Sequence, residues 1–136
     1  ARIDVYSPID DAYDDFNDYS PIMKLTYGET KLMFTGDAEE LAEKQVLEKY
    51  TSSELKSDVL KFGHHGSSTS SSEEFLNAVS PTYGVISCGL DNKYGHPHKE
   101  TLEKIKNHNI ETYRTDTQGQ IQLTSDGKNI VFKTKK

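Results

Sequence analysis

The sequence predicts an α/β fold, with a mixed sheet flanked by helices in a single domain that covers residues 1–136. Short apolar runs with strand character alternate with segments in which apolar residues recur at helical spacing. Two turn signals, Gly28-Glu29 and Asp126-Gly127, each separate two strand-like runs and therefore predict hairpins. A chain of 136 residues is long enough for one domain with a modest core.

The first half of the chain is expected to form an edge strand, a hairpin and a helix. Residues 2–6 alternate between polar and apolar side chains, and an aspartate-rich loop follows at residues 7–20. Residues 22–27 and 31–35 flank the first turn signal and form the hairpin. Residues 38–50 carry apolar side chains at helical spacing, which predicts the first helix.

The second half is expected to alternate between strands and helices after a polar linker at residues 51–57. Strand 58–62 stops at Gly63, and a buried strand covers residues 83–87. The helices cover residues 72–79, which Pro81 terminates, and residues 99–107. The remaining strands are expected at residues 111–114, 120–124 and 129–132.

The composition limits the classes of function. The net charge of −6 argues against broad electrostatic attraction to nucleic acid, but a bound metal ion would supply its own positive charge. No apolar run approaches the roughly 18 residues of a membrane helix, so no membrane segment is expected in this chain. The single cysteine, Cys88, excludes an internal disulfide and a cysteine-based zinc cluster.

Two adjacent histidines are the strongest local signal. His64 and His65 follow the strand at 58–62, lie between Gly63 and Gly66, and precede a hydroxyl-rich run. The carboxyl ends of strands are where open α/β sheets place ligand-binding groups. Neutral imidazole is both a common metal ligand and a general base near neutral pH. The alternative is a polar loop with two solvated histidines, and the strand-end position favours a functional site.

These motifs resemble the metallo-β-lactamase superfamily and, more narrowly, the hydrolase domain of ComEC-type DNA-internalisation competence proteins. The resemblance spans about residues 17–133 and implies the second half of an αβ/βα sandwich, so the chain would be a partial domain. It also implies an extracytoplasmic location at the cell surface. The matching stretches are residues 17–20, residues 34–37 (Phe-Thr-Gly-Asp), residues 58–70 (Asp-Val-Leu-Lys-Phe-Gly-His-His-Gly-Ser-Ser-Thr-Ser), residues 92–98 and residues 113–119.

The resemblance implies a metal-dependent hydrolase that cleaves phosphodiesters, in DNA, with Zn²⁺ or Mn²⁺ as the divalent metal. Asp37 would bridge two metals, although an aspartate before a helix is also explained by capping. His65 would be a terminal ligand and His64 would face the substrate or support the ligands, with their order left open. His96 would contact a phosphate or protonate a leaving oxygen.

Other polar residues are expected at the margins of the same site. Asn17 would line it, and Ser67 and Ser68 would contact the substrate phosphate unless they only cap the following helix. Ser71 and Glu74 have the spacing of a capping box for that helix. His98 is expected to be an exposed, structural residue at a helix start.

One departure from the superfamily pattern is decisive for activity. The main metal motif, His-x-(His or Asp)-x-Asp-His, is absent, and no histidine precedes His64. Asp37 and one histidine are two ligands, whereas a stable site takes at least three from protein. We therefore expect this chain alone to be inactive with an incomplete metal site, and the resemblance assigns the function to a longer protein. The rival interpretation is a binding or structural module that has lost catalysis.

An unpartnered sheet face is a further expectation. The missing N-terminal half-domain would cover one face of the sheet in a complete sandwich, and two copies of this chain could form a homodimer instead. The residues expected to form that face are Ile22, Leu25, Met33, Val59, Leu60, Val85 and Ile86.

Overall fold

Six strands form one mixed sheet, as the sequence predicts, in a computed structural model that describes every residue from 1 to 136. The strands lie side by side in chain order; the first three are antiparallel and the last four are parallel. Their bounds are β1 (Arg2–Ser7), β2 (Ile22–Tyr27), β3 (Thr30–Phe34), β4 (Val59–Lys61), β5 (Tyr83–Ile86) and β6 (Glu111–Arg114).

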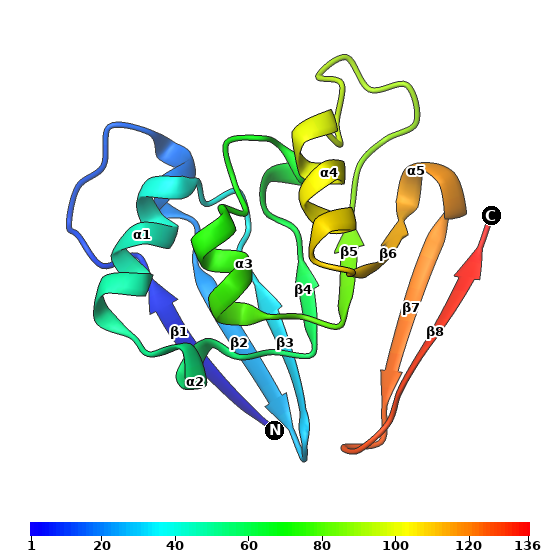
Figure 1. Ribbon diagram of the computed structural model, residues 1–136, viewed down its shortest axis with the longest axis horizontal. Coiled ribbons are helices and arrows are strands. Elements are labelled where there is room, and N and C mark those ends of the chain that lie inside the picture. Colours follow the sequence, from blue (N-terminus) through cyan, green and yellow to red (C-terminus); the bar gives the residue numbers. More distant parts are fainter.

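Three helices cover one face of this sheet (Figure 1): α1 (Glu40–Lys49), α3 (Glu73–Val79) and α4 (Lys99–Asn107). Two further short helices, α2 (Ser52–Leu55) and α5 (Thr115–Gln118), were not expected from the sequence. The polar linker that precedes β4 therefore contains α2. None of the helices has both the length and the apolar character that a membrane crossing requires.

Local capping explains where two of these helices begin. At α2, the Thr51 side chain accepts a hydrogen bond from the backbone N–H of Glu54, whose carboxylate accepts one from the Thr51 N–H. At α3, the hydroxyl of Ser72, not that of Ser71, accepts from the Phe75 N–H at 3.2 Å. The predicted capping box at Ser71 is therefore wrong by one residue, because Ser71 adopts a positive φ of 58°.

The core lies between the sheet and the helices. Phe62 and Phe75 are fully buried there, with Met33 and Leu60 beneath them on neighbouring strands. Burying each such side chain contributes about 1.5–3 kcal/mol. Gly84 on β5 leaves the room that the Phe62 ring needs, because a Cβ at that position would lie 2.5 Å from it.

A separate hairpin packs against part of the opposite face. It consists of β7 (Gln120–Ser125) and β8 (Ile130–Lys135), and Phe132 stacks on Tyr113 of β6 at 4.2 Å. Its tip meets the β2–β3 turn, where the Glu29 N–H donates to the Gly127 carbonyl oxygen at 2.6 Å. An apolar cleft of about 180 Å³ remains between the hairpin and strands β3 to β5.

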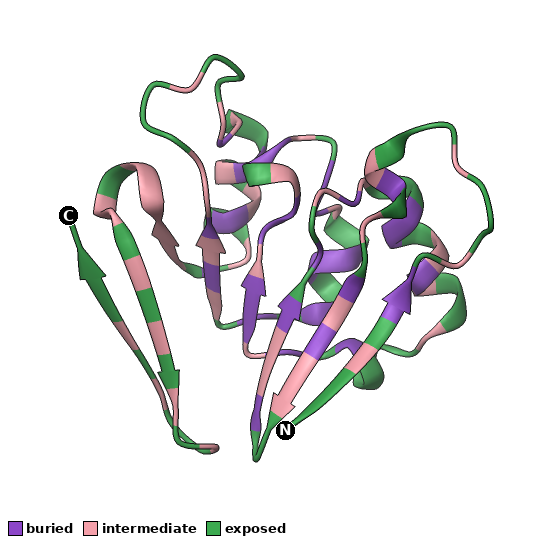
Figure 2. Ribbon diagram, turned by 180° about the vertical axis from the view of Figure 1, so that it is seen from behind, coloured by how far each residue is buried: buried purple, intermediate pink, exposed green.

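On the rest of that face, β1 to β3 carry exposed and half-buried residues (Figure 2), and several of the exposed ones are apolar. Ile3 is 62% exposed and Val5 is 58% exposed, and the strand register places them in rows with Leu25 and Phe34. An open apolar face therefore exists, but its predicted composition was partly wrong. Successive residues of a strand point to opposite faces. The members of the predicted set that instead lie buried in the core are Ile22, Met33, Leu60 and Ile86.

Candidate functional site

Three loops meet at the carboxyl ends of the parallel strands, at the upper edge of Figure 1. Asp37 follows β3, His64 and His65 follow β4, and His96 lies in the loop after β5. The His64 N–H donates to the Gly36 carbonyl oxygen at 2.9 Å, which ties the first two loops together. The fold therefore brings these four of the seven predicted site residues to one edge of the sheet.

The imidazole of His65 faces the carboxylate of Asp37. Its Nδ1 lies 2.7 Å from the carbonyl oxygen of Ser87 and donates to it, and its Nε2 lies 3.6 Å from Asp37 Oδ1. In the neutral ring this leaves an Nε2 lone pair directed at a carboxylate oxygen. Two acceptors that face each other suit a cation between them, and a backbone carbonyl on Nδ1 is the usual support for a metal-binding histidine.

The backbone at the two histidines is strained. His64 has a φ of 48° and His65 a φ of 58°, both in the left-handed region that side chains with a Cβ seldom adopt. Each such residue costs on the order of 1–3 kcal/mol, and strain of this kind gathers at functional sites. The fold holds both rings toward the same edge at the expense of stability.

His64 lies on the inner side of the cluster. Its Nδ1 is buried, has no hydrogen-bond partner and lies 3.9 Å from Glu39 Oε2. Its ring centroid lies 6.2 Å from that of His65 and 5.7 Å from that of His96. The sequence did not predict a role for Glu39. It is the residue before α1 and therefore takes the N-cap position that was one alternative for Asp37.

His96 completes the group of rings. It stacks on His65 at 6.0 Å and lies 4.7 Å from the ring of His98. Burial lowers the pKa of His96, and the neighbouring imidazoles lower it further, which favours the neutral form of the ring. Asn92 orders this loop, because its side chain accepts from the His96 N–H and donates to the His96 carbonyl oxygen.

His98 braces two loops, and it is half-buried although we expected it to be exposed. Its Nδ1 accepts from the Ser68 N–H at 2.9 Å, so Nε2 carries the proton and donates to the Tyr94 carbonyl oxygen at 3.0 Å. With both ring nitrogens engaged, His98 has a structural role, as the sequence predicted, at the N-cap position of α4.

The three residues predicted to contact the substrate are buried or half-buried. The Ser67 side chain is buried, and its hydroxyl lies 2.9 Å from that of Thr69. Ser68 is half-buried, with its hydroxyl 3.1 Å from His98 Nδ1, and Asn17 is half-buried in the 3-10 turn Phe16–Tyr19. Their contacts with substrate stay predictions, and Ser67 would have to turn outward to make one.

A buried carboxylate that the sequence did not single out supports the histidine loop. Glu43 on α1 is fully buried and accepts from the backbone N–H groups of Ser71 at 2.6 Å and Ser72 at 2.8 Å. Burial raises the pKa of Glu43 against the effect of these hydrogen bonds. Its signal in the sequence was a charge within the apolar stripe of α1, between Ala42 and Val46.

The residues at this edge supply only some of the ligands that a metal site needs. No group of three or more His, Cys, Asp or Glu side chains lies close enough together to hold an ion. Asp37 and His65 supply a carboxylate oxygen and an imidazole nitrogen, which suit Zn²⁺ or Mn²⁺. A further ligand from outside this set would be needed to complete the coordination.

The chain is similar in sequence to bacterial competence and recombination proteins. It is 39% identical over 106 residues to ComE operon protein 3 of Bacillus subtilis and 43% identical over 109 residues to competence protein ComA of Neisseria gonorrhoeae. It is also 34% identical over 107 residues to recombination protein 2 of Haemophilus influenzae. These matches support the assignment of the chain to the competence-protein family. No family model matches the chain.

The matched segment is a small part of each relative. The alignments cover 78%, 80% and 79% of this chain but only 13%, 16% and 13% of the three relatives. The chain therefore spans less than a fifth of the length of each relative, and an activity of the whole competence protein is for this chain a proposal. The resemblance to the metallo-β-lactamase superfamily is not tested by these matches and stays a prediction.

Proposed function

We propose that this chain supplies part of a metal-dependent hydrolase site that cleaves phosphodiesters in DNA during competence-type DNA uptake. The observation that carries the proposal is the pair formed by His65 and Asp37, whose acceptor atoms face each other at 3.6 Å, with His65 on a strained turn. The similarity to competence proteins supports the role in DNA uptake. The metal, the substrate and an extracytoplasmic location belong to the proposal.

Asp37 and His65 would hold the ion, and the other residues would act on the substrate. A divalent metal, when bound, supplies Lewis acidity toward a phosphoryl oxygen. His65 would bind the metal ion through Nε2, because the Ser87 carbonyl oxygen fixes the proton on Nδ1. The lowered pKa of His96 favours a neutral ring, which would donate one N–H to a phosphate oxygen. A role as the general acid that protonates the leaving oxygen is less favoured. The missing ligands would come from another segment of a longer protein.

Metal binding and catalysis are tested with three variants. Asp37→Asn and His65→Ala should each abolish cleavage of DNA and weaken binding of Mn²⁺ or Zn²⁺, because each removes one donor. His108→Ala is the matched control, since His108 at the end of α4 pairs with Glu73 at the start of α3 and belongs to none of the three site loops. The assays are metal titration on this chain and nuclease rates on a protein of the length of its competence relatives. Undiminished metal binding and cleavage in His65→Ala would refute the proposal.

A non-catalytic binding module is the second candidate. The observation that favours it is that no three metal-binding side chains gather in this chain. This candidate predicts DNA binding by the longer protein that is unchanged by Asp37→Asn, without cleavage in the presence of either metal. Metal-dependent cleavage that Asp37→Asn removes would exclude it.

A further inference from the structure

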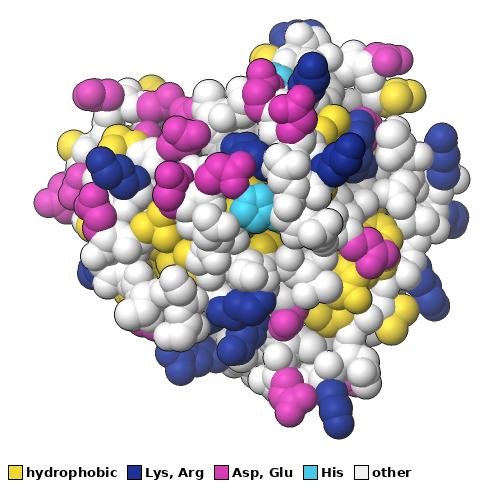
Figure 3. All heavy atoms as spheres, viewed as in Figure 1, with side chains coloured by type: hydrophobic (Ala, Val, Ile, Leu, Met, Phe, Trp, Pro, Cys, Tyr) yellow, Lys and Arg dark blue, Asp and Glu magenta, His cyan; other side chains and the backbone are white.

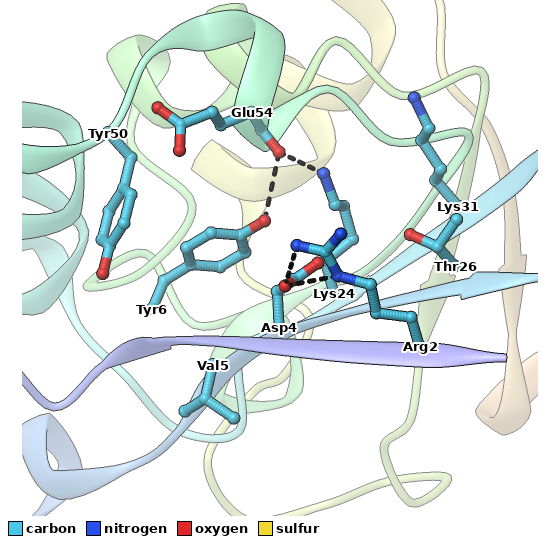
Figure 4. A pocket seen from close by; sticks show the side chains of 9 residues that line it. All are labelled: Arg2, Asp4, Val5, Tyr6, Lys24, Thr26, Lys31, Tyr50 and Glu54. Carbon is cyan, nitrogen blue, oxygen red and sulfur yellow. Dashed lines mark hydrogen bonds and ion pairs between the residues drawn. The ribbon is translucent and has the colours of Figure 1, made fainter.

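A second concave site lies at the opposite end of the sheet from the histidine cluster. A pocket of about 460 Å³ opens between β1, β2 and α2 (Figure 4). Pockets that bind small molecules commonly enclose about 300–1,000 Å³. Three basic side chains, Arg2, Lys24 and Lys31, and two acidic ones, Asp4 and Glu54, are among the residues that line it.

Lys24 is the central group of this pocket. Lys24 is only 7% exposed, and its ammonium donates to one acceptor, the backbone carbonyl oxygen of Glu54. An ammonium carries three donors, so two of them lack a hydrogen-bond acceptor in the protein, and the ammonium otherwise faces the Tyr6 ring, whose centroid lies 5.9 Å from Nζ. Burial lowers the pKa of Lys24, and the positive charge of Lys31 lowers it further. A buried charge of this kind is costly unless a partner of opposite charge compensates it.

The two acidic side chains are already engaged elsewhere. Asp4 accepts from the Arg2 guanidinium at 2.7 and 2.9 Å. The Glu54 carboxylate accepts from the Thr51 N–H and hydroxyl, both at 3.1 Å, as part of the α2 cap. The Lys31 ammonium forms no ion pair and no hydrogen bond. The pocket therefore presents two ammonium groups without anionic partners, in a protein whose net charge is −6.

The surface distribution of charge agrees with this. Acidic side chains gather over the α1 side of the molecule, whereas basic side chains lie at its lower edge near α2 (Figure 3). An anion would be repelled from the first region and attracted to the second. The pocket is thus a local reversal of the overall charge.

We propose that this pocket binds a phosphate group between the ammonium groups of Lys24 and Lys31. Phosphate offers several acceptor oxygens, which can take the unused donors of both side chains at once. Lysine acts there as a compact point charge, which does not demand the planar geometry of a guanidinium. The group is either free inorganic phosphate or a phosphodiester of a nucleic acid. The proposal shares no residue with the hydrolase site, so either one can fail alone.

Inorganic phosphate is the first probe, titrated into the intact chain in chloride buffer while backbone amide signals are followed by NMR. Saturable shifts are expected at Lys24, Lys31 and Tyr50. Lys31→Gln should weaken binding about tenfold, because it keeps an N–H donor but removes one of the two positive charges that would hold the phosphate. Lys99→Gln is the matched control, because Lys99 lies on α4 with an 86% exposed side chain. Absent saturation, or equal weakening in both variants, would overturn the proposal.

Two further arms remove the remaining ambiguities. Lys24→Met keeps the length of the side chain without its charge, so it should fold, melt at a higher temperature and gain nothing from added phosphate. A phosphate-dependent rise in melting temperature that persists in Lys24→Met would also overturn the proposal. A short single-stranded oligonucleotide that displaces phosphate from these residues identifies a phosphodiester as the ligand. Failure to displace it identifies free phosphate.

Discussion

Replacing Glu43 with glutamine tests how the histidine loop is held. The carboxylate of Glu43 spans the gap between α1 and the turn that follows the histidines, with one oxygen on each of two backbone N–H groups at 2.6 and 2.8 Å. Glutamine keeps the shape but replaces one acceptor with an NH₂ group. One buried N–H of Ser71 or Ser72 then faces a donor and loses its hydrogen bond.

The expected cost follows from that loss. Leaving one buried donor unsatisfied costs about 1–3 kcal/mol. Glu43→Ala should cost more, about 2–6 kcal/mol, because it leaves both buried N–H groups without an acceptor. Lys104 donates to the Ser71 carbonyl oxygen at 2.7 Å and approaches the same turn. Urea unfolding of the three proteins at pH 7 gives these differences directly as shifts of the midpoint at constant slope.

The pH dependence has a fixed sign. The pKa of Glu43 is raised by burial above its ordinary 4.5, so the folded state holds this proton more tightly than the unfolded state. Stability of the wild-type protein therefore falls as the pH rises from 4.5 through the raised pKa, and Glu43→Gln lacks that decline. The exposed Glu74→Gln is the control and should change neither quantity. If Glu43→Gln and Glu74→Gln unfold at the same urea concentration, the carboxylate does not hold the loop.

Two other predictions concern the open side of the sheet. Burial lowers the pKa of Lys61 below 10.5, so the folded state binds this proton more weakly than the unfolded state does. Lys61→Met should therefore raise the melting temperature at pH 7. The increase should vanish above pH 10.5, where the lysine is neutral in both states. A melting temperature that does not rise in Lys61→Met at pH 7 would contradict this. We also expect the chain to form a dimer through its exposed apolar face, which sedimentation would detect. Val5→Glu should dissociate this dimer. Leu90→Glu, on a loop outside that face, should leave it intact. A wild-type chain that sediments as a monomer at high concentration would refute the second prediction.

The parts of the fold that the sequence predicted are those that local patterns determine. β4 ends two residues before Gly63 and Pro81 follows α3, so the position of His64 and His65 at a strand end could be predicted from neighbouring residues alone. The apolar face was assigned incorrectly in part, because Val59 and Leu60 are adjacent and point to opposite faces, and composition does not show which side the helices cover. Helix α2 was missed because four residues are too short for helical periodicity.

The site itself depends on contacts between distant residues, which spacing cannot give. His65 and Ser87 are 22 positions apart, and only the fold places the carbonyl oxygen that sets the tautomer of the ring. His98 and Ser68 are 30 positions apart and define the opposite tautomer in the same way. The two histidines therefore differ in chemistry although the sequence presents the same side chain. His65 keeps a free Nε2 beside Asp37, whereas both nitrogens of His98 are used within the protein. Which histidine can bind a ligand is thus decided by its hydrogen-bond partners.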